Sequence, residues 1–433
     1  MGNAMMIEGD VLLRGQGTDN QQLIPIMAHP PQTDSDITLY EWLQLATNAH
    51  KGIKLDFKSI ESVDLALQIV EQSKAKLSVP VQLSAEVAEG PNSFMAPNKY
   101  LDPRRFIKQC MTAFPESTLS LGWTNGWSTD GVQIYSWSMV KVMHDIVASA
   151  DVQQPLTFNV RAKLVKNSLT QLKWLMEMTG GTLTLFSPQL DKLNSNEILN
   201  VRHRLSKDKV FYDIDSSIKA ELEKVPLDGG LDERQKFQLG QWKAIHSKDG
   251  EKIYLGSEAL IFQNGLLISR EEFHLENGRD AVTIKGQVEF INIPTVPESG
   301  DSVTSPVGLG IFLRVSQGSI ATIVSGIRCF IGFDGHLEIS TQSIPGMDRR
   351  QEATVSGTLP CFSFVIDDYQ DMDKIVMTVS RLKSCSDVVQ HADEDHVTKI
   401  EFSMKDIEIH SHYMAIRAPS TQAFAVVDYF LMA

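Results

Sequence analysis

The chain has 433 residues, of which 42% are hydrophobic and 22% are charged, the balance of an ordinary globular protein. This length predicts more than one domain, since a single hydrophobic core rarely serves more than ~250–300 residues. The net charge of −14 argues against a nucleic-acid-binding protein, which usually carries a basic excess. No apolar run approaches the ~20 residues of a membrane span, and the first residues lack the pattern of a signal peptide.

The pattern of predicted elements changes near residue 225. Before it, apolar strand segments alternate with helical patterns, which is typical of a parallel sheet covered by helices. These strands are expected at residues 6–13, 24–29, 53–58, 81–86, 118–123, 157–162, 182–187 and 210–214. After residue 225 helical patterns almost vanish, and roughly ten strand segments predict an antiparallel β-sandwich. The turn-rich segment 226–233 therefore separates two expected domains, residues 1–225 and 226–433.

The first half has about the number of strand segments that a (β/α)₈ barrel of the TIM type needs. No helical pattern lies between the first two segments, so 6–13 and 24–29 are interpreted as one barrel strand with a β-ribbon excursion. Seven barrel strands then remain, and the chain begins inside a strand. We therefore expect a TIM-type barrel that lacks its first strand, followed by the β-sandwich.

Charged residues share one face of several predicted strands. Because side chains alternate along a strand, Glu8 and Asp10 lie on one face of the first segment. Lys54, Asp56 and Lys58 likewise share a face of 53–58. The outer face of a barrel strand packs against helices, so these charges should point inward, near the strand ends where barrel active sites lie. A web of structural salt bridges is the alternative explanation.

Glu8, Asp10 and Asp56 are predicted to bind a divalent cation, because three carboxylates without a cysteine favour calcium or magnesium over zinc. Lys58 is a candidate catalytic residue that supplies positive charge to an anionic oxygen, such as that of a phosphate ester. His29 is the second candidate, since histidine titrates near neutral pH, although a structural role is its alternative. Five further residues are candidates for substrate binding: Lys54, Glu86, Trp123, Arg161 and Asp213.

The four cysteines include no Cys-x-x-Cys pair, which argues against zinc ribbons and thioredoxin-like sites. Among Cys329, Cys361 and Cys385, one disulfide or reduced buried thiols both fit the sequence, and reduced thiols are the favoured interpretation. His410 and His412 share a face of a predicted strand, where solvent exposure is the expectation and metal binding the alternative.

Four segments together resemble the menorin family. They are residues 8–13 (Glu-Gly-Asp-Val-Leu-Leu), 25–31 (Pro-Ile-Met-Ala-His-Pro-Pro), 52–58 (Gly-Ile-Lys-Leu-Asp-Phe-Lys) and 119–124 (Leu-Ser-Leu-Gly-Trp-Thr), with support from 158–162 and 210–214. The resemblance covers residues 5–220, and the second half looks like the C-terminal extension of some menorin-like proteins. The menorin family is in turn similar to glycerophosphodiester phosphodiesterase-like barrels.

In those enzymes a Glu-x-Asp pair and a later acidic-x-Lys element bind a cation and the phosphate. Glu8 and Asp10 match the first element, and Asp56 and Lys58 match the second. His29 matches the second catalytic histidine, although a proline follows it where the enzymes have aspartate. The histidine that the family carries at the end of the first barrel strand has no counterpart in this sequence. The resemblance therefore implies a chain that is inactive towards phosphodiesters.

The resemblance implies an extracellular or cell-surface protein that binds partners or signals, with a role in shaping neurons. The alternative function is a metal-dependent phosphodiesterase of the glycerophosphodiester type. A third hypothesis gives the function to the sandwich, as a carbohydrate- or protein-binding module. The expected partners are cell-surface proteins or a phosphodiester ligand, and not nucleic acid.

Overall fold

The computed structural model divides into two compact units, Met1–Asp232 and Glu233–Ala433. It describes residues 5–74, 77, 79–96, 99–126, 134–188, 191–224, 239–245, 251–274, 280–293, 307–316, 324–385, 392–407, 409, 411–419 and 423–432. The predicted boundary segment, 226–233, lies outside these residues. Among the helices described, none combines the length and the apolar character needed to cross a membrane.

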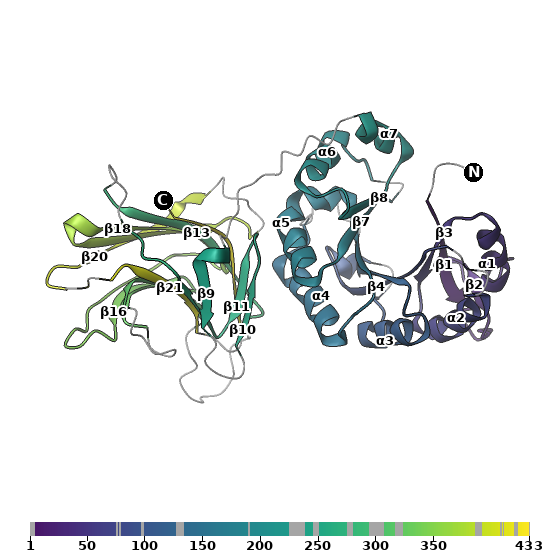
Figure 1. The fold of residues 1–433 in the computed structure, drawn as a ribbon, viewed down its shortest axis with the longest axis horizontal. Helices are drawn as coiled ribbons and strands as arrows, with labels where there is room; N and C mark the ends of the chain where they lie inside the picture. Colours follow the sequence, from purple (N-terminus) through teal and green to yellow (C-terminus); the bar gives the residue numbers. More distant parts are fainter. Residues whose placement is uncertain are drawn as a thin grey trace. The chain divides into compact units, whose positions relative to one another are not determined.

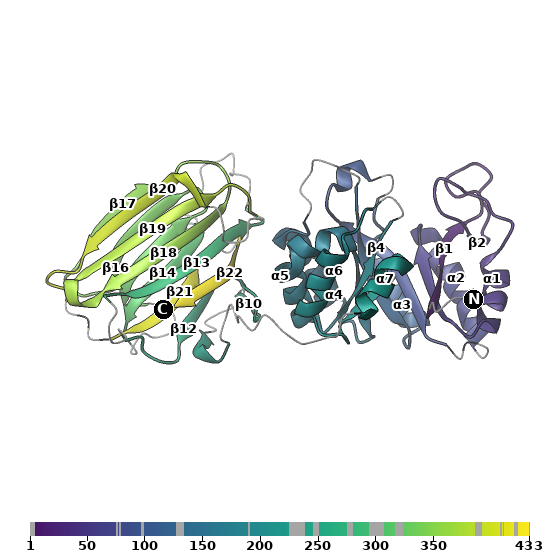
Figure 2. The ribbon, with the colours of Figure 1, turned by 90° about the horizontal axis from the view of Figure 1, so that it is seen from above.

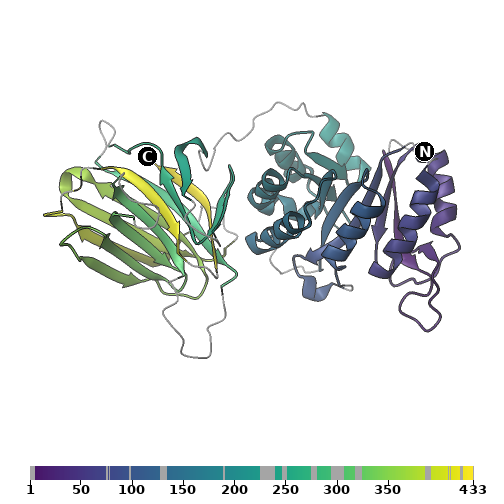
Figure 3. The same cartoon turned by 60° about the horizontal axis from the view of Figure 1, so that its bottom comes forward.

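The first unit is a half-barrel, a curved sheet with helices along its outer side (Figure 1 and Figure 3). The strand order is β2-β1-β3-β4-β5-β6-β7-β8, with β2 antiparallel to β1 and the other neighbours parallel. The strands are β1 (Met6–Leu13), β2 (Pro25–Met27), β3 (Gly52–Phe57), β4 (Val81–Glu89), β5 (Thr118–Thr124), β6 (Leu156–Arg161), β7 (Thr182–Phe186) and β8 (Val210–Asp213). The helices are α1 (Leu39–Asn48), α2 (Ile60–Ser73), α3 (Pro103–Ala113), α4 (Trp137–Ala150), α5 (Ala162–Thr179), α6 (Ser195–Arg204) and α7 (Ser216–Lys224).

Apolar side chains on one face of each strand hold the helices to the sheet. Leu55, Leu83 and Leu121 lie in adjacent strands and are fully buried on this face. The ring of Phe57 in β3 lies 5.8 Å from that of Phe106 in α3. Apolar burial of this kind contributes about 25 cal/mol per Å², which makes the helix-covered face the main stabilising layer of the unit.

The predicted TIM-type barrel lacking its first strand is wrong. β2 turns back along β1, with Val11 opposite Met27 and Leu13 opposite Pro25, which confirms the ribbon interpretation. This ribbon forms one edge of the sheet and β8 forms the other, and no pairing between described strands joins the two edges. A barrel requires such closure. Strand and helix patterns report local faces only, so they could not reveal that the sheet is open.

The second unit is a β-sandwich of two seven-stranded antiparallel sheets, as the sequence predicts (Figure 2). One sheet contains, in spatial order, β10 (Lys252–Leu255), β11 (Leu260–Gln263), β22 (Phe424–Met432), β13 (Val282–Ile291), β18 (Cys361–Tyr369), β19 (Lys374–Leu382) and β20 (Ala392–Ser403). The other contains β17 (Arg350–Thr354), β16 (His336–Gln342), β15 (Gly326–Gly332), β14 (Gly308–Val315), β21 (Tyr413–Ala418), β12 (Gly265–Ser269) and β9 (Trp242–Ile245). A single core between the sheets takes alternate residues from both, such as Ile284 and Phe364 from one and Leu309 and Ile311 from the other.

Cys361 and Cys385 form a disulfide that connects the start of β18 to the residues after β19. The favoured interpretation of reduced thiols is therefore wrong for this pair. Cys329 is a free cysteine buried in the sandwich core, and Cys110 is a free cysteine buried in α3. Burial raises the pKa of both thiols, which makes them poor nucleophiles.

Candidate functional site

The inner face of the half-barrel carries a row of polar residues. Asp10 lies opposite Asp56, Asp56 opposite Ser84, and Ser84 opposite Ser120, so the row crosses β1, β3, β4 and β5. Each of these residues alternates with apolar neighbours that face the helices. The alternation that buries the outer face therefore gathers the polar side chains on the inner one.

Three carboxylates meet at the end of this row. Glu8 and Asp10 come from β1 and Asp56 from β3, and one oxygen of each lies within 4.8 Å of the others. None of the three is fully buried. Oxygen donors at this spacing are a set that a hard divalent cation can share.

Two lysines pair with these carboxylates: Lys54, which lies in β3, and Lys58, which directly follows β3. Lys54 Nζ lies 3.0 Å from Glu8 Oε1, while Lys58 Nζ lies 2.5 Å from Asp56 Oδ2 and 3.2 Å from Asp10 Oδ1. Burial lowers the pKa of Lys58, but the charges of Asp56 and Asp10 outweigh it and hold that pKa above its usual value. The ammonium of Lys58 therefore stays charged and pairs with both aspartates.

Burial also shifts two glutamates of the inner face. It raises the pKa of Glu86 in β4 to about 7, against the opposing charge of Lys58. It raises the pKa of Glu8 as well, against Lys54, and the carboxylates of Asp56 and Asp213 add to that rise. Asp213 ends β8, so the field at Glu8 includes a charge from the far edge of the sheet.

Glu86 predicts a specific dependence of stability on pH. A folded-state pKa of about 7 lies above that of an unfolded glutamate, so this group weakens the fold as pH rises from about 4.5 to 7. Relative to wild type, the free energy of unfolding of the Glu86→Gln variant should be about 2 kcal/mol higher at pH 8 than at pH 4.5. Urea denaturation at both pH values measures this change. The control is Glu89→Gln, an exposed position in the same strand, whose stability relative to wild type should be the same at both pH values. Equal behaviour of the two variants would contradict the prediction.

Two predicted substrate-binding residues are engaged elsewhere. Trp123 is buried on the helix side of β5, where its Nε1 donates to the carbonyl of Met139 at 3.4 Å. Arg161 lies at the end of β6, and its Nε and terminal nitrogen donate to the two oxygens of Asp191 at 2.6 and 2.5 Å. This bidentate pair occupies the guanidinium that the sequence assigns to substrate binding.

The structure places His29 just after β2, at the edge of the sheet. The N–H of Ala28 donates to the carbonyl of Asp10 at 3.0 Å, which fixes this segment beside the end of β1. The exposed ring of His29 has its Nδ1 2.6 Å from the carbonyl oxygen of Pro30. Within the described part of the chain, its ring pairs with none of the three carboxylates.

Three buried polar atoms on the inner face have no hydrogen-bond partner among the described residues: Gln82 Nε2, Ser120 Oγ and Asn159 Oδ1. Gln82 is 7% exposed and Ser120 is fully buried. Asn159 reaches from β6 to β4, where its Nδ2 donates to Ser84 Oγ at 3.1 Å, because Gly122 of β5 leaves room between them. Such atoms are rare in native proteins unless water or a ligand meets them. Sequence analysis did not single out Ser120, although alternation in β5 would have indicated it.

The structure describes one of the two histidines noted in the sequence, His412 of the second unit. The ring of His412 lies 5.5 Å from that of His274, and its Nδ1 is 3.3 Å from Gln370 Nε2. Burial and the charge of Arg314 hold the pKa of His412 below its usual value. His410 lies outside the described residues, so the face that the two histidines were predicted to share stays a prediction.

Two family models together match most of the chain: the Menorin N-terminal domain over residues 1–219 and the Menorin C-terminal domain over residues 244–418. The chain belongs to the menorin family. Protein FAM151B of Homo sapiens is 43% identical to this menorin-family chain over 213 residues, which are 49% of this chain and 75% of the human protein. The resemblance seen in the sequence is confirmed at the level of the family.

Solved structures similar to this menorin-family chain match only weakly. A legume lectin-like domain from Entamoeba histolytica has 11% identity and a TM-score of 0.31, and covers 45% of this chain and 90% of that chain. The carbohydrate recognition domain of Emp46p, in a potassium-bound form, has 12% identity and a TM-score of 0.30, and covers 46% of this chain and 90% of that chain. At these TM-scores the similarity carries no information on function.

Proposed function

We propose that this menorin-family chain is an extracellular or cell-surface binding protein. Its first unit holds a divalent cation, calcium or magnesium, at Glu8, Asp10 and Asp56, and binds an anionic phosphate-ester group there. The observation that carries the proposal is the approach of three carboxylate oxygens to within 4.8 Å on two neighbouring strands. Oxygen donors from carboxylates are what these two cations prefer.

The charges of the site suit a singly charged anion. Three carboxylates and two lysines leave one net negative charge, which a divalent cation converts to one positive charge. A cation beside Asp10 and Asp56 competes with the ammonium of Lys58 for the same oxygens. Lys58 is then free to donate to an anionic oxygen, so a phosphodiester, with one negative charge, balances the site.

The unpaired polar atoms of the inner face support a ligand with hydroxyl groups. Gln82 Nε2 can donate, Asn159 Oδ1 can accept, and Ser120 Oγ can do both. A glycerol or sugar esterified to the phosphate would offer matching groups. Satisfying these buried atoms would contribute binding free energy, since each buried and unpaired polar atom costs about 1–3 kcal/mol.

The disulfide between Cys361 and Cys385 supports a location outside the cytosol. Disulfides form and persist in secreted and surface proteins, whereas the cytosol keeps thiols reduced. The proposed partners are therefore molecules of the cell surface, and a role in shaping neurons is the corresponding biological proposal.

A metal-dependent phosphodiesterase is the second candidate function, and Glu86 supports it. A carboxyl group with a pKa of about 7 can both donate and accept a proton near neutral pH. Phosphodiester hydrolysis needs protonation of the leaving oxygen and activation of water, and a bound cation would supply charge neutralisation at the phosphate. Binding is preferred because the exposed ring of His29 contacts the carbonyl of Pro30 and pairs, within the described residues, with none of the three carboxylates.

Titration with glycerophosphocholine, a phosphodiester, tests both functions. The full chain should bind it in the presence of calcium or magnesium and lose binding in EDTA. The Asp56→Asn variant should weaken binding at least about tenfold, whereas Asp64→Asn on the exposed side of α2 should not. Phosphorus NMR of the same samples distinguishes binding from hydrolysis. The proposal would be contradicted if neither EDTA nor the Asp56→Asn substitution changed the affinity for glycerophosphocholine.

A further inference from the structure

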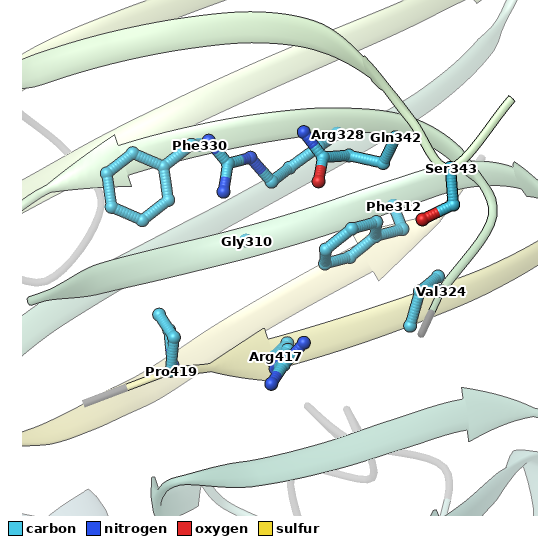
Figure 4. Close-up of a pocket in the computed structure, with 9 residues that line it drawn as sticks. All are labelled: Gly310, Phe312, Val324, Arg328, Phe330, Gln342, Ser343, Arg417 and Pro419. Carbon is cyan, nitrogen blue, oxygen red and sulfur yellow. The ribbon is translucent and has the colours of Figure 1, made fainter. Parts of the chain in front are cut away.

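The second unit has a pocket on the sheet face that points away from the sandwich core. Its volume is about 220 Å³. Leu309, Ile311 and Leu313 of β14 enter the core, so alternation turns Gly310 and Phe312 to the opposite face. The pocket is lined by Gly310, Phe312, Val324, Arg328, Phe330, Gln342, Ser343, Arg417 and Pro419 (Figure 4).

Gly310 opens the pocket at the centre of the sheet. It lies directly between Phe330 of β15 and Arg417 of β21 in the strand register. Gly308 lies two residues earlier on the same face, and a Cβ there would lie 2.2 Å from the ring of Phe330. Close packing against that ring therefore requires a glycine at position 308. The nearest atoms to a Cβ at Gly310 would be the edge of the Phe312 ring at 3.0 Å and the carbonyl of Arg417 at 3.6 Å. A glycine inside a strand often marks a bulge, a bend, or a site where a ligand or another backbone approaches closely.

The two arginines of the pocket differ in their partners. Arg328 pairs with Glu338, and its guanidinium lies 5.0 Å from the centre of the Phe330 ring. Glu338 also pairs with Arg350, which in turn pairs with Glu352. The two positive charges of Arg328 and Arg350 are therefore balanced by the two negative charges of these glutamates. The side chain of Arg417 has no hydrogen-bond or ion-pair partner among the described residues. The pocket therefore presents one uncompensated positive charge.

The walls beside this charge are apolar. Figure 4 shows the rings of Phe312 and Phe330 on the same side of the sheet as the two guanidinium groups, with Pro419 and Val324 at the margins. Pockets that hold whole drug-sized ligands have volumes of ~300–1,000 Å³, so this smaller one suits a single ring. A flat ring can lie against a phenylalanine while a charged substituent pairs with an arginine.

We propose that this pocket binds a single ring that carries one carboxylate, with the carboxylate on Arg417 and the ring against Phe312 and Phe330. One negative charge balances the one uncompensated guanidinium, whereas a doubly charged phosphate monoester would not. The amide of Gln342 and the hydroxyl of Ser343 lie at the same pocket and serve polar substituents of the ring. The ring belongs either to an acidic sugar or to an aromatic acid, since both share this chemistry.

Ligand-observed NMR and calorimetry on the full chain test the proposal, with glucuronate and benzoate as probes. Their neutral counterparts, glucose and benzyl alcohol, are the reference ligands. One of the two acids should bind at least about tenfold more tightly than its neutral counterpart, and the acid that does so identifies the kind of ring. Acids that bind no better than the neutral ligands, or no binding of either acid, would overturn the proposal.

Two substitutions locate the binding. Arg417→Gln should weaken binding of the acid at least about tenfold, whereas Lys285→Gln, the same charge loss at an exposed position of β13 in the other sheet, should not. Gly310→Val should abolish binding by filling the pocket, and it should fold because valine favours strands and the nearest atom to a Cβ at this position belongs to the ring of Phe312, a side chain that can shift. Circular dichroism and the melting temperature verify the fold of each variant. Equal loss with Lys285→Gln, or full binding by folded Gly310→Val, would place the acid elsewhere.

Discussion

The Asp191→Asn variant should lose about 3–5 kcal/mol of stability in the first unit. Its wild-type carboxylate accepts two hydrogen bonds from Arg161, and the side chains of Asp191 and Arg161 are only 2% and 8% exposed. Removing the negative charge takes away the carboxylate that accepts from two nitrogens of a buried guanidinium. The cost is large because a buried charge that has lost its hydration then lacks the opposite charge that offset this loss. Urea denaturation followed by circular dichroism measures it.

The matched control is Glu197→Gln. Glu197 pairs with Lys166 at 3.1 Å, but both side chains are well exposed, at 39% and 53%. Water screens such a pair, so its loss should cost less than about 1 kcal/mol. If the Asp191 variant is no less stable than this control, the buried pair with Arg161 does not contribute the stability that we assign to it.

The Lys58→Met variant should make the first unit depend on divalent cations. In the wild type the ammonium of Lys58 is the shared partner of Asp10 and Asp56. Without it, two carboxylates face each other across β1 and β3. In EDTA the variant should lose about 2 kcal/mol of stability relative to wild type, and millimolar calcium or magnesium should restore it by binding the folded state. Thermal melts with and without cation measure the difference.

The same variant separates the roles of the lysine. The affinity for the cation should rise at least about tenfold because a competing positive charge is gone, while binding of glycerophosphocholine should weaken. Lys108→Met on the exposed side of α3 is the control and should change neither. A Lys58 variant whose stability ignores cations would show that no cation enters between these two strands.

The inner face of the half-barrel could be predicted from the sequence because it depends on alternation alone. Glu8 and Asp10, and Lys54 and Asp56, fall on the expected faces since a strand fixes the direction of every second side chain. Helix starts could be predicted for the same local reason. Thr38 and Glu41 form the capping box that their spacing indicates.

Other features depend on partners far along the chain, and the sequence does not identify those partners. Asp191 follows β7, 30 residues beyond Arg161, and nothing in either segment indicates their pairing. The Cys361–Cys385 disulfide and the open edges of the sheet are likewise long-range features. Trp123 is different, because alternation with the buried Leu121 would have placed it against the helices.

Calorimetric titration of the metal-free full chain with calcium and with magnesium tests the cation site most directly. We expect one of the two to bind at a single site with a Kd of roughly 10⁻⁴–10⁻³ M, the range of weak carboxylate sites. Asp10→Asn and Asp56→Asn should each weaken it at least about tenfold, and Asp64→Asn should leave it unchanged. An absence of binding, or equal affinity in wild type and in the Asp10 and Asp56 variants, would contradict the account.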